Sequence, residues 1–98
     1  MVGLSPRAED DLETLVDHYI AIGRPEVART LFLAVDRVKA RIERAPDSGL
    51  SAPRPYPKVR AAGVKWMLEA RYWFAYSIGE PRAIIGIFYA AADIPNRF

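Results

Sequence analysis

The chain has 98 residues, of which 51% are hydrophobic and 27% are charged, a composition typical of globular rather than disordered proteins. This length predicts a single domain, 1–98, with a thin margin of stability. With no cysteine and one histidine, the sequence excludes a disulfide framework and cysteine or histidine metal clusters, so we expect no metal and no cofactor. No apolar run is long enough for a membrane span or a signal peptide, which predicts a cytoplasmic protein without membrane attachment.

The net charge of +2 is unevenly distributed along the chain. Residues 1–49 carry seven Lys or Arg against nine Asp or Glu, which gives −2. Residues 50–98 carry seven against three, which gives +4. A basic half fits an acidic partner, such as nucleic acid, the ribosome or an acidic protein segment. The alternative is a solvated surface on which the asymmetry has no role.

The first part of the sequence predicts a short strand followed by two helices. Residues 1–4 form an apolar run, and Ser5 with Pro6 has the form of an N-cap and a first helical residue. Apolar residues then recur at spacings of three and four, which predicts a helix over 6–22. A second stripe with the same spacing predicts a helix over 25–45. The short connection between them predicts a helical hairpin.

The second part predicts an extended connector followed by three strands. Residues 46–60 contain four prolines, which favour an ordered, extended segment because proline fixes φ and donates no ladder hydrogen bond. Alternating or continuous apolar runs predict strands over 64–69, 71–78 and 83–89 with tight connections, which form an antiparallel meander. The order β-α-α-β-β-β predicts an α+β fold, with the helical hairpin packed on one face of a small, mainly antiparallel sheet.

Alternation along the strands sorts their side chains into two sets. The set expected in the core comprises Val64, Trp66, Leu68, Tyr72, Phe74, Tyr76, Ile85 and Ile87. The set expected on the outer face comprises Lys65, Met67, Arg71, Trp73, Ser77, Ile84, Gly86 and Phe88. This sorting predicts an exposed sheet face that carries cations and an exposed Trp73.

Two stretches of sequence resemble the ParE/RelE toxin superfamily. LSPRAEDDLETLVDHY resembles the family's entry into its first helix, with a serine-proline cap, an acidic pair and a leucine. GVKWMLEARYWFAYSIGEPRAIIGIFYAAAD resembles its meander, with a basic residue after glycine, the alternating Tyr72 and Tyr76, an I-x-I strand and the closing Asp93. The resemblance covers nearly the whole chain. It implies a type II toxin that binds a cognate ParD-like antitoxin directly, in a hetero-oligomer that prevents growth arrest.

The resemblance leaves the activity open. RelE-like members cut messenger RNA on the ribosome, whereas ParE-like members poison DNA gyrase without being enzymes. RNA cleavage needs a base, an acid and positive charge on the phosphate, for which the sequence offers Tyr89, Arg71 and Lys65. Tyr89 stands where the family often has histidine, and Gly86 and Ala91-Ala92 stand where it often has basic residues. We therefore favour gyrase inhibition without catalysis, and keep a ribosome-dependent endonuclease or an inactive interaction module as alternatives.

Two groups of residues are expected to make the contacts. The surface that docks on the target is predicted to comprise Arg60, Lys65, Arg71, Trp73, Arg82, Arg97 and Phe98. The surface that binds the antitoxin is predicted to comprise His18, Val27, Leu33, Arg37 and Arg41. The alternative for the arginines of the second helix is a solvated face, and for His18 it is a role in surface or helix packing.

Overall fold

The computed structural model describes residues 2–91 and 94. Its elements are β1 (Gly3–Leu4), α1 (Pro6–Ala21), α2 (Pro25–Arg44), a 3₁₀ turn (Pro46–Ser48), β2 (Val64–Glu69), β3 (Tyr72–Ser77) and β4 (Ala83–Tyr89). The predicted α+β class and the order β-α-α-β-β-β are confirmed. Within the described ranges, no helix has the length and apolar character needed to cross a membrane.

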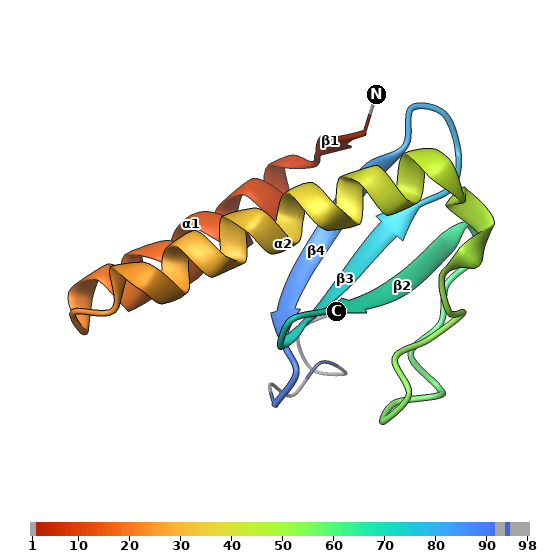
Figure 1. The fold of residues 1–98 in the computed structure, drawn as a ribbon. Helices are drawn as coiled ribbons and strands as arrows, with labels where there is room; N and C mark the ends of the chain where they lie inside the picture. The colour runs from red at the N-terminus through yellow and green to blue at the C-terminus, as the bar shows by residue number, and fades with distance from the viewer. Residues whose placement is uncertain (1, 92–93, 95–98) are drawn as a thin grey trace.

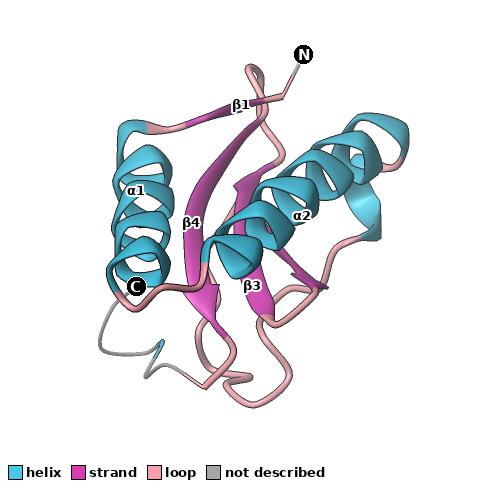
Figure 2. Ribbon diagram, turned by 60° about the vertical axis from the view of Figure 1, so that its left-hand side comes forward, coloured by secondary structure: helices cyan, strands magenta, loops and turns pink. Residues whose placement is uncertain are grey.

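One mixed sheet carries the helical hairpin on one of its faces. The strand order is β1-β4-β3-β2, in which β1 runs parallel to β4 and the other neighbours are antiparallel. Figure 1 shows α1 and α2 side by side, with their connected end projecting beyond the sheet. Figure 2 shows that both helices lie on the same face, α1 beside β4 and α2 in front of β3.

The helices begin where the sequence provides a cap and bury one stripe each. The Ser5 hydroxyl accepts a hydrogen bond from the Ala8 amide at 3.1 Å, and Pro6 occupies the first turn, where no amide is needed. Along α2 the buried stripe has helical spacing and comprises Ala28, Leu31, Ala34, Val35, Val38 and Ile42. Packing of this stripe on the sheet fixes the position of the hairpin.

The sheet separates two apolar clusters. The helix-side core lies between the sheet and the hairpin, and its buried members include Leu31, Val38, Ile42, Met67, Phe74, Tyr76, Ile84 and Ile87. The loop-side core lies on the opposite face and comprises Trp66, Trp73, Ala75, Phe88 and Ile94, with Leu50, Tyr56 and Val59 packed against it. Both faces of the sheet are therefore covered by protein.

The predicted orientation of β2 is wrong. Met67 lies opposite Phe74 and Lys65 opposite Tyr76, so both residues share the helix side of the sheet. Trp66 lies opposite Ala75 and belongs to the loop-side core. Ala70, with φ of 56°, turns the chain together with Arg71, so that Glu69 lies opposite Tyr72. The two-residue turn sets this register, and alternation within a strand cannot reveal it.

A β-bulge reverses the first residues of β4. Tyr76 lies opposite Ile84 and Ala75 lies opposite Gly86, which leaves Ile85 as the extra residue. Ile84 is therefore in the helix-side core and Ile85 packs on the loop-side core, the reverse of the prediction for both. Beyond the bulge, Ile87 faces the helices as predicted.

The connector after α2 does more than join two elements, because it covers the outer sheet face. Leu50 and Trp66 exchange two backbone hydrogen bonds of 2.7 Å, and the Tyr56 amide donates to the Pro53 carbonyl at 2.9 Å. Trp73 is only 3% exposed beneath this cover, so the prediction of an exposed Trp73 is wrong. Phe88, also predicted to face outward, is on that face but is buried.

Candidate interaction surfaces

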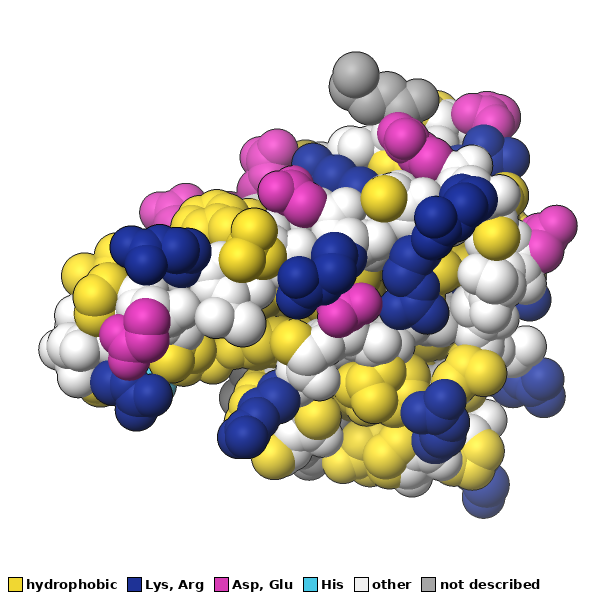
Figure 3. All heavy atoms as spheres, in the orientation of Figure 1, with side chains coloured by type: hydrophobic (Ala, Val, Ile, Leu, Met, Phe, Trp, Pro, Cys, Tyr) yellow, Lys and Arg dark blue, Asp and Glu magenta, His cyan; other side chains and the backbone are white. Residues whose placement is uncertain are grey.

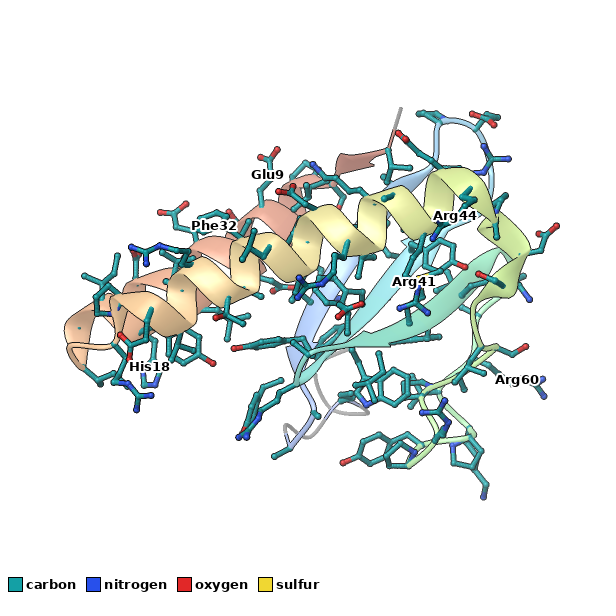
Figure 4. The ribbon with its side chains drawn as sticks, in the orientation of Figure 1. Glu9, His18, Phe32, Arg41, Arg44 and Arg60 are labelled. Carbon is teal, nitrogen blue, oxygen red and sulfur yellow. The ribbon has the colours of Figure 1, made fainter. Side chains whose placement is uncertain are left out.

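A groove of about 1220 Å³ lies between the projecting end of the hairpin and the nearby end of the sheet. Its walls come from α1, α2, the β2–β3 turn and the end of β4, and include His18, Tyr19, Val27, Arg71, Tyr72 and Tyr89. Figure 4 shows His18 near the free end of the hairpin. We call this feature the hairpin groove.

Three tyrosines form the floor of the hairpin groove. The hydroxyls of Tyr19 and Tyr72 are hydrogen-bonded to each other, and the rings of Tyr72 and Tyr89 meet edge to face at 5.9 Å. Burial raises the pKa of Tyr72, and the hydrogen bond with Tyr19 raises it further. Tyr72 therefore stays protonated at neutral pH, which suits a structural contact better than a catalytic base.

The rim of the hairpin groove carries fixed charges. Arg24 and Glu26 form an ion pair at the start of α2, and the hydrogen bond from Arg24 lowers the pKa of Glu26. Arg71 is exposed on the β2–β3 turn and lines the groove from the sheet side. The groove therefore combines aromatic walls with charged groups at its mouth, a composition suited to binding a protein segment.

A smaller hollow of about 330 Å³ lies at the opposite end of β2. It is lined by Ser51, Arg60 and Lys65, together with residues 61–64 and Ile78. Figure 4 shows Arg60 projecting outward from the loop, far from the hairpin groove. We call this hollow at the end of β2 the basic pocket.

No protein-family model matches the sequence, and no curated protein does either. Among solved structures, a chain of the chromosomal ParDE TA system from P. aeruginosa is similar, with a TM-score of 0.64 and 19% identity. The match covers 91% of this chain and 96% of that one. The two chains share one fold. The predicted resemblance to the ParE/RelE proteins is thus confirmed at the level of the fold.

The residues considered for RNA cleavage do not converge. Arg71 and the half-exposed Tyr89 line the hairpin groove, whereas Lys65 lines the basic pocket. Tyr89 lies opposite Tyr72, and Lys65 lies opposite Tyr76, four residues further along β3. Four residues of strand span about 13 Å. One phosphate group cannot touch both residues across that distance.

The residues predicted to dock on the target are divided between several places. Arg60 and Lys65 share the basic pocket, and Arg71 is in the hairpin groove. Arg82 forms an ion pair of 3.0 Å with Glu80 in the β3–β4 turn. Trp73 is buried, with the Arg54 guanidinium 5.8 Å from its ring centre. Outside the described residues lie Ala92, Asp93, Arg97 and Phe98.

The residues predicted to bind the antitoxin lie along the hairpin. His18 and Val27 line the hairpin groove, and Leu33 is 52% exposed on α2. Arg37 and Arg41 both bind the Glu69 carboxylate, at 3.2 Å and 3.4 Å, and so tie α2 to the end of β2. The sequence positions of these two arginines did not reveal this pair of surface contacts with Glu69.

Sequence reasoning missed several exposed apolar side chains of the hairpin. Ile20 and Ile22 are exposed by 58% and 55%, and Phe32, next to Leu33, by 48%. Figure 3 shows hydrophobic side chains gathered along the projecting part of the hairpin. Phe32 has the spacing of the predicted stripe, four residues after Ala28 and three before Val35, so the expectation that it is buried is wrong.

Proposed function

We propose that this protein is the toxin of a type II toxin–antitoxin module and is held inactive by direct binding of a ParD-like antitoxin. The observation that carries the proposal is the projecting hairpin, which exposes Ile20, Ile22, Phe32 and Leu33 and also forms one wall of a large groove. Exposed apolar side chains gathered on one projecting element are typical of a protein-binding site. The fold shared with a chain of a ParDE system supports the same assignment.

The antitoxin segment is proposed to lie along the hairpin and in the hairpin groove. An apolar face of the segment would cover Leu33 and Val27, and polar groups would meet His18 and Arg71 at the rim. Apolar burial contributes about 25 cal/mol per Å², so a segment of this kind would also stabilise the small toxin fold by mass action.

The target is proposed to be DNA gyrase, in the cytoplasm, and the action to be docking without catalysis. The separation of Lys65 from Tyr89 and Arg71 supports docking, because RNA cleavage needs an acid, a base and a cation around one phosphate. Burial of the outer sheet face under the connector supports it as well, since an RNA strand would find no open aromatic surface there.

The test combines growth, gyrase and ribosome measurements on one protein. Expression of the toxin should arrest growth, and DNA replication should stop earlier than protein synthesis. Co-expression of the antitoxin encoded beside it should restore growth. Purified toxin should inhibit supercoiling by gyrase. Arg71→Ala should weaken that inhibition, whereas Arg29→Ala, an equal loss of charge on exposed α2 surface, should leave it unchanged.

The alternatives give distinct outcomes in the same experiments. Defined cuts in messenger RNA on translating ribosomes, abolished by Tyr89→Phe, would establish a ribonuclease and refute gyrase docking. Normal growth, without effect on gyrase or messenger RNA, would establish an inactive interaction module.

A further inference from the structure

One segment of the chain concentrates positive charge without any compensating acid. Between Gly49 and Leu68 the sequence contains Arg54, Lys58, Arg60 and Lys65 and no Asp or Glu. We call residues 49–65 the basic loop. By contrast, α1 carries five acids and one arginine, a net charge of −4, on the other side of the sheet. The basic loop and α1 therefore carry opposite net charges.

The cations of the basic loop are available to a partner. Arg54, Lys58 and Arg60 are exposed and Lys65 is half-buried. Over residues 2–91 and 94, the ion pairs of the structure involve arginines of the helical hairpin and of the β3–β4 turn, and none involves these four side chains. Their charge is not neutralised within the described structure.

The basic loop is held in one conformation by the fold. Pro53 is fully buried, and Tyr56 and Val59 pack against the loop-side core. The backbone exchange between Leu50 and Trp66 anchors the loop to β2. A fixed platform loses little conformational entropy on binding, so its cations are preorganised for a charged surface.

The basic pocket provides one site of the right chemistry for a phosphate group. Arg60, Lys65 and Ser51 are among the residues that line a hollow of about 330 Å³. Two cations and a hydroxyl donor are the groups that typically contact phosphate oxygens of a nucleic-acid backbone.

We propose that the basic loop docks on the sugar–phosphate backbone of duplex DNA. A protein partner would need an apolar contact area, yet none of the large apolar side chains exposed in residues 2–91 and 94 lies in the loop. A single strand would need aromatic stacking surfaces, and Trp73 is buried beneath Arg54. The choice of DNA over an RNA duplex rests on the proposed gyrase target, because gyrase acts on DNA.

The proposal predicts a specific dependence on salt. The purified protein is titrated against a fluorescent 20-bp duplex at several salt concentrations. The logarithm of the association constant should fall linearly with the logarithm of the salt concentration, with a slope near −3.6 for four phosphate contacts at about −0.9 each. Raising NaCl from 50 to 200 mM should then weaken binding roughly 150-fold. The R54Q/K58Q/R60Q variant keeps only Lys65 of the four cations. Its slope should be about −0.9, and the same rise in NaCl should weaken its binding to DNA only roughly threefold.

A matched control variant tests whether the position of the removed cations matters, or only the net charge of the protein. R29Q/K39Q/R44Q removes three unpaired cations from α2 and should keep the slope of the unmodified chain, and both variants should melt normally. An equal loss of binding in the two triple variants would overturn the proposal. So would binding to a polyglutamate peptide or to single-stranded RNA as tight as binding to the duplex. The DNA-binding assay contains no gyrase, so DNA binding with the expected salt slope, together with no inhibition of gyrase in the separate supercoiling assay, would refute only the proposed target.

Discussion

The two faces of the sheet are covered by different kinds of structure. On one face two regular helices pack on residues such as Phe74 and Ile84, and the apolar stripes of both helices are legible in the sequence. On the other face a proline-rich connector without regular structure covers Trp66, Trp73 and Phe88. Both covers bury their residues to below 5% exposure. An irregular segment can therefore complete a core as fully as a helix does.

The largest expected effect tests whether the loop-side core matters to stability. Trp73→Ala should cost about 3–5 kcal/mol of unfolding free energy, comparable to Phe74→Ala on the helix side, because each removes a fully packed aromatic ring. The matched control is Phe32→Ala on exposed α2 surface, which should change stability by less than about 0.5 kcal/mol. Urea denaturation measures all three variants. A Trp73→Ala protein as stable as the control would show that the connector is only a loose cover.

The helices and strands were predictable because their signals are local. Caps, prolines and apolar spacing placed the ends of α1 and α2 within one residue of those observed. Face assignments failed where they depended on a neighbouring strand: the turn at Ala70 set the side on which Met67 lies, and the bulge at Ile85 reversed Ile84. The continuous apolar run of β3 did contain a signal for a second cover, because strands buried on both faces lose their alternation.

The candidate site was predictable only in part. His18 and Val27, which the sequence analysis assigns to the antitoxin, line the hairpin groove. Tyr19 and Tyr72 were not assigned to a site, because their pairing depends on contact between residues 53 positions apart. Trp73 was wrongly expected to be exposed, since the sequence does not show where the connector runs.

The second prediction concerns the hydroxyl that joins the two covers. Tyr76 belongs to the helix-side core, yet its hydroxyl donates to the Pro46 carbonyl at 2.8 Å and accepts from the Gly49 amide at 3.0 Å. Tyr76→Phe leaves both backbone groups without this partner, so it should cost about 1–3 kcal/mol. Tyr89→Phe, at an exposed ring, is the control and should be nearly neutral. Equal stability of the two variants would contradict an anchoring role for this hydroxyl.

The third prediction separates the two covers by their dynamics. The Trp66 amide donates to Leu50 of the connector rather than to β3, so its protection from hydrogen exchange requires the connector to stay in place. Amides of β3, the strand paired on both sides, should be protected by the whole fold. We expect Trp66 to exchange roughly tenfold faster than Phe74, an opening about 1.4 kcal/mol easier. Equal exchange rates at these two amides would mean that connector and sheet open as one unit.

The last prediction concerns two substitutions that should barely change stability, although each should weaken the binding of a different partner. Leu33→Ser on the hairpin and Lys58→Ser on the basic loop both change exposed side chains, so each should alter the unfolding free energy by less than about 0.5 kcal/mol. Leu33 is 52% exposed on α2, so covering this surface contributes about 1 kcal/mol. Leu33→Ser should therefore weaken antitoxin binding roughly fivefold and leave DNA binding intact.

Lys58→Ser should weaken DNA binding and leave antitoxin binding intact, and the slope of DNA binding against salt should be smaller by about 0.9. Titrations of antitoxin and duplex DNA against both variants measure the four effects, and a variant that impaired both partners equally would place antitoxin and DNA on the same surface.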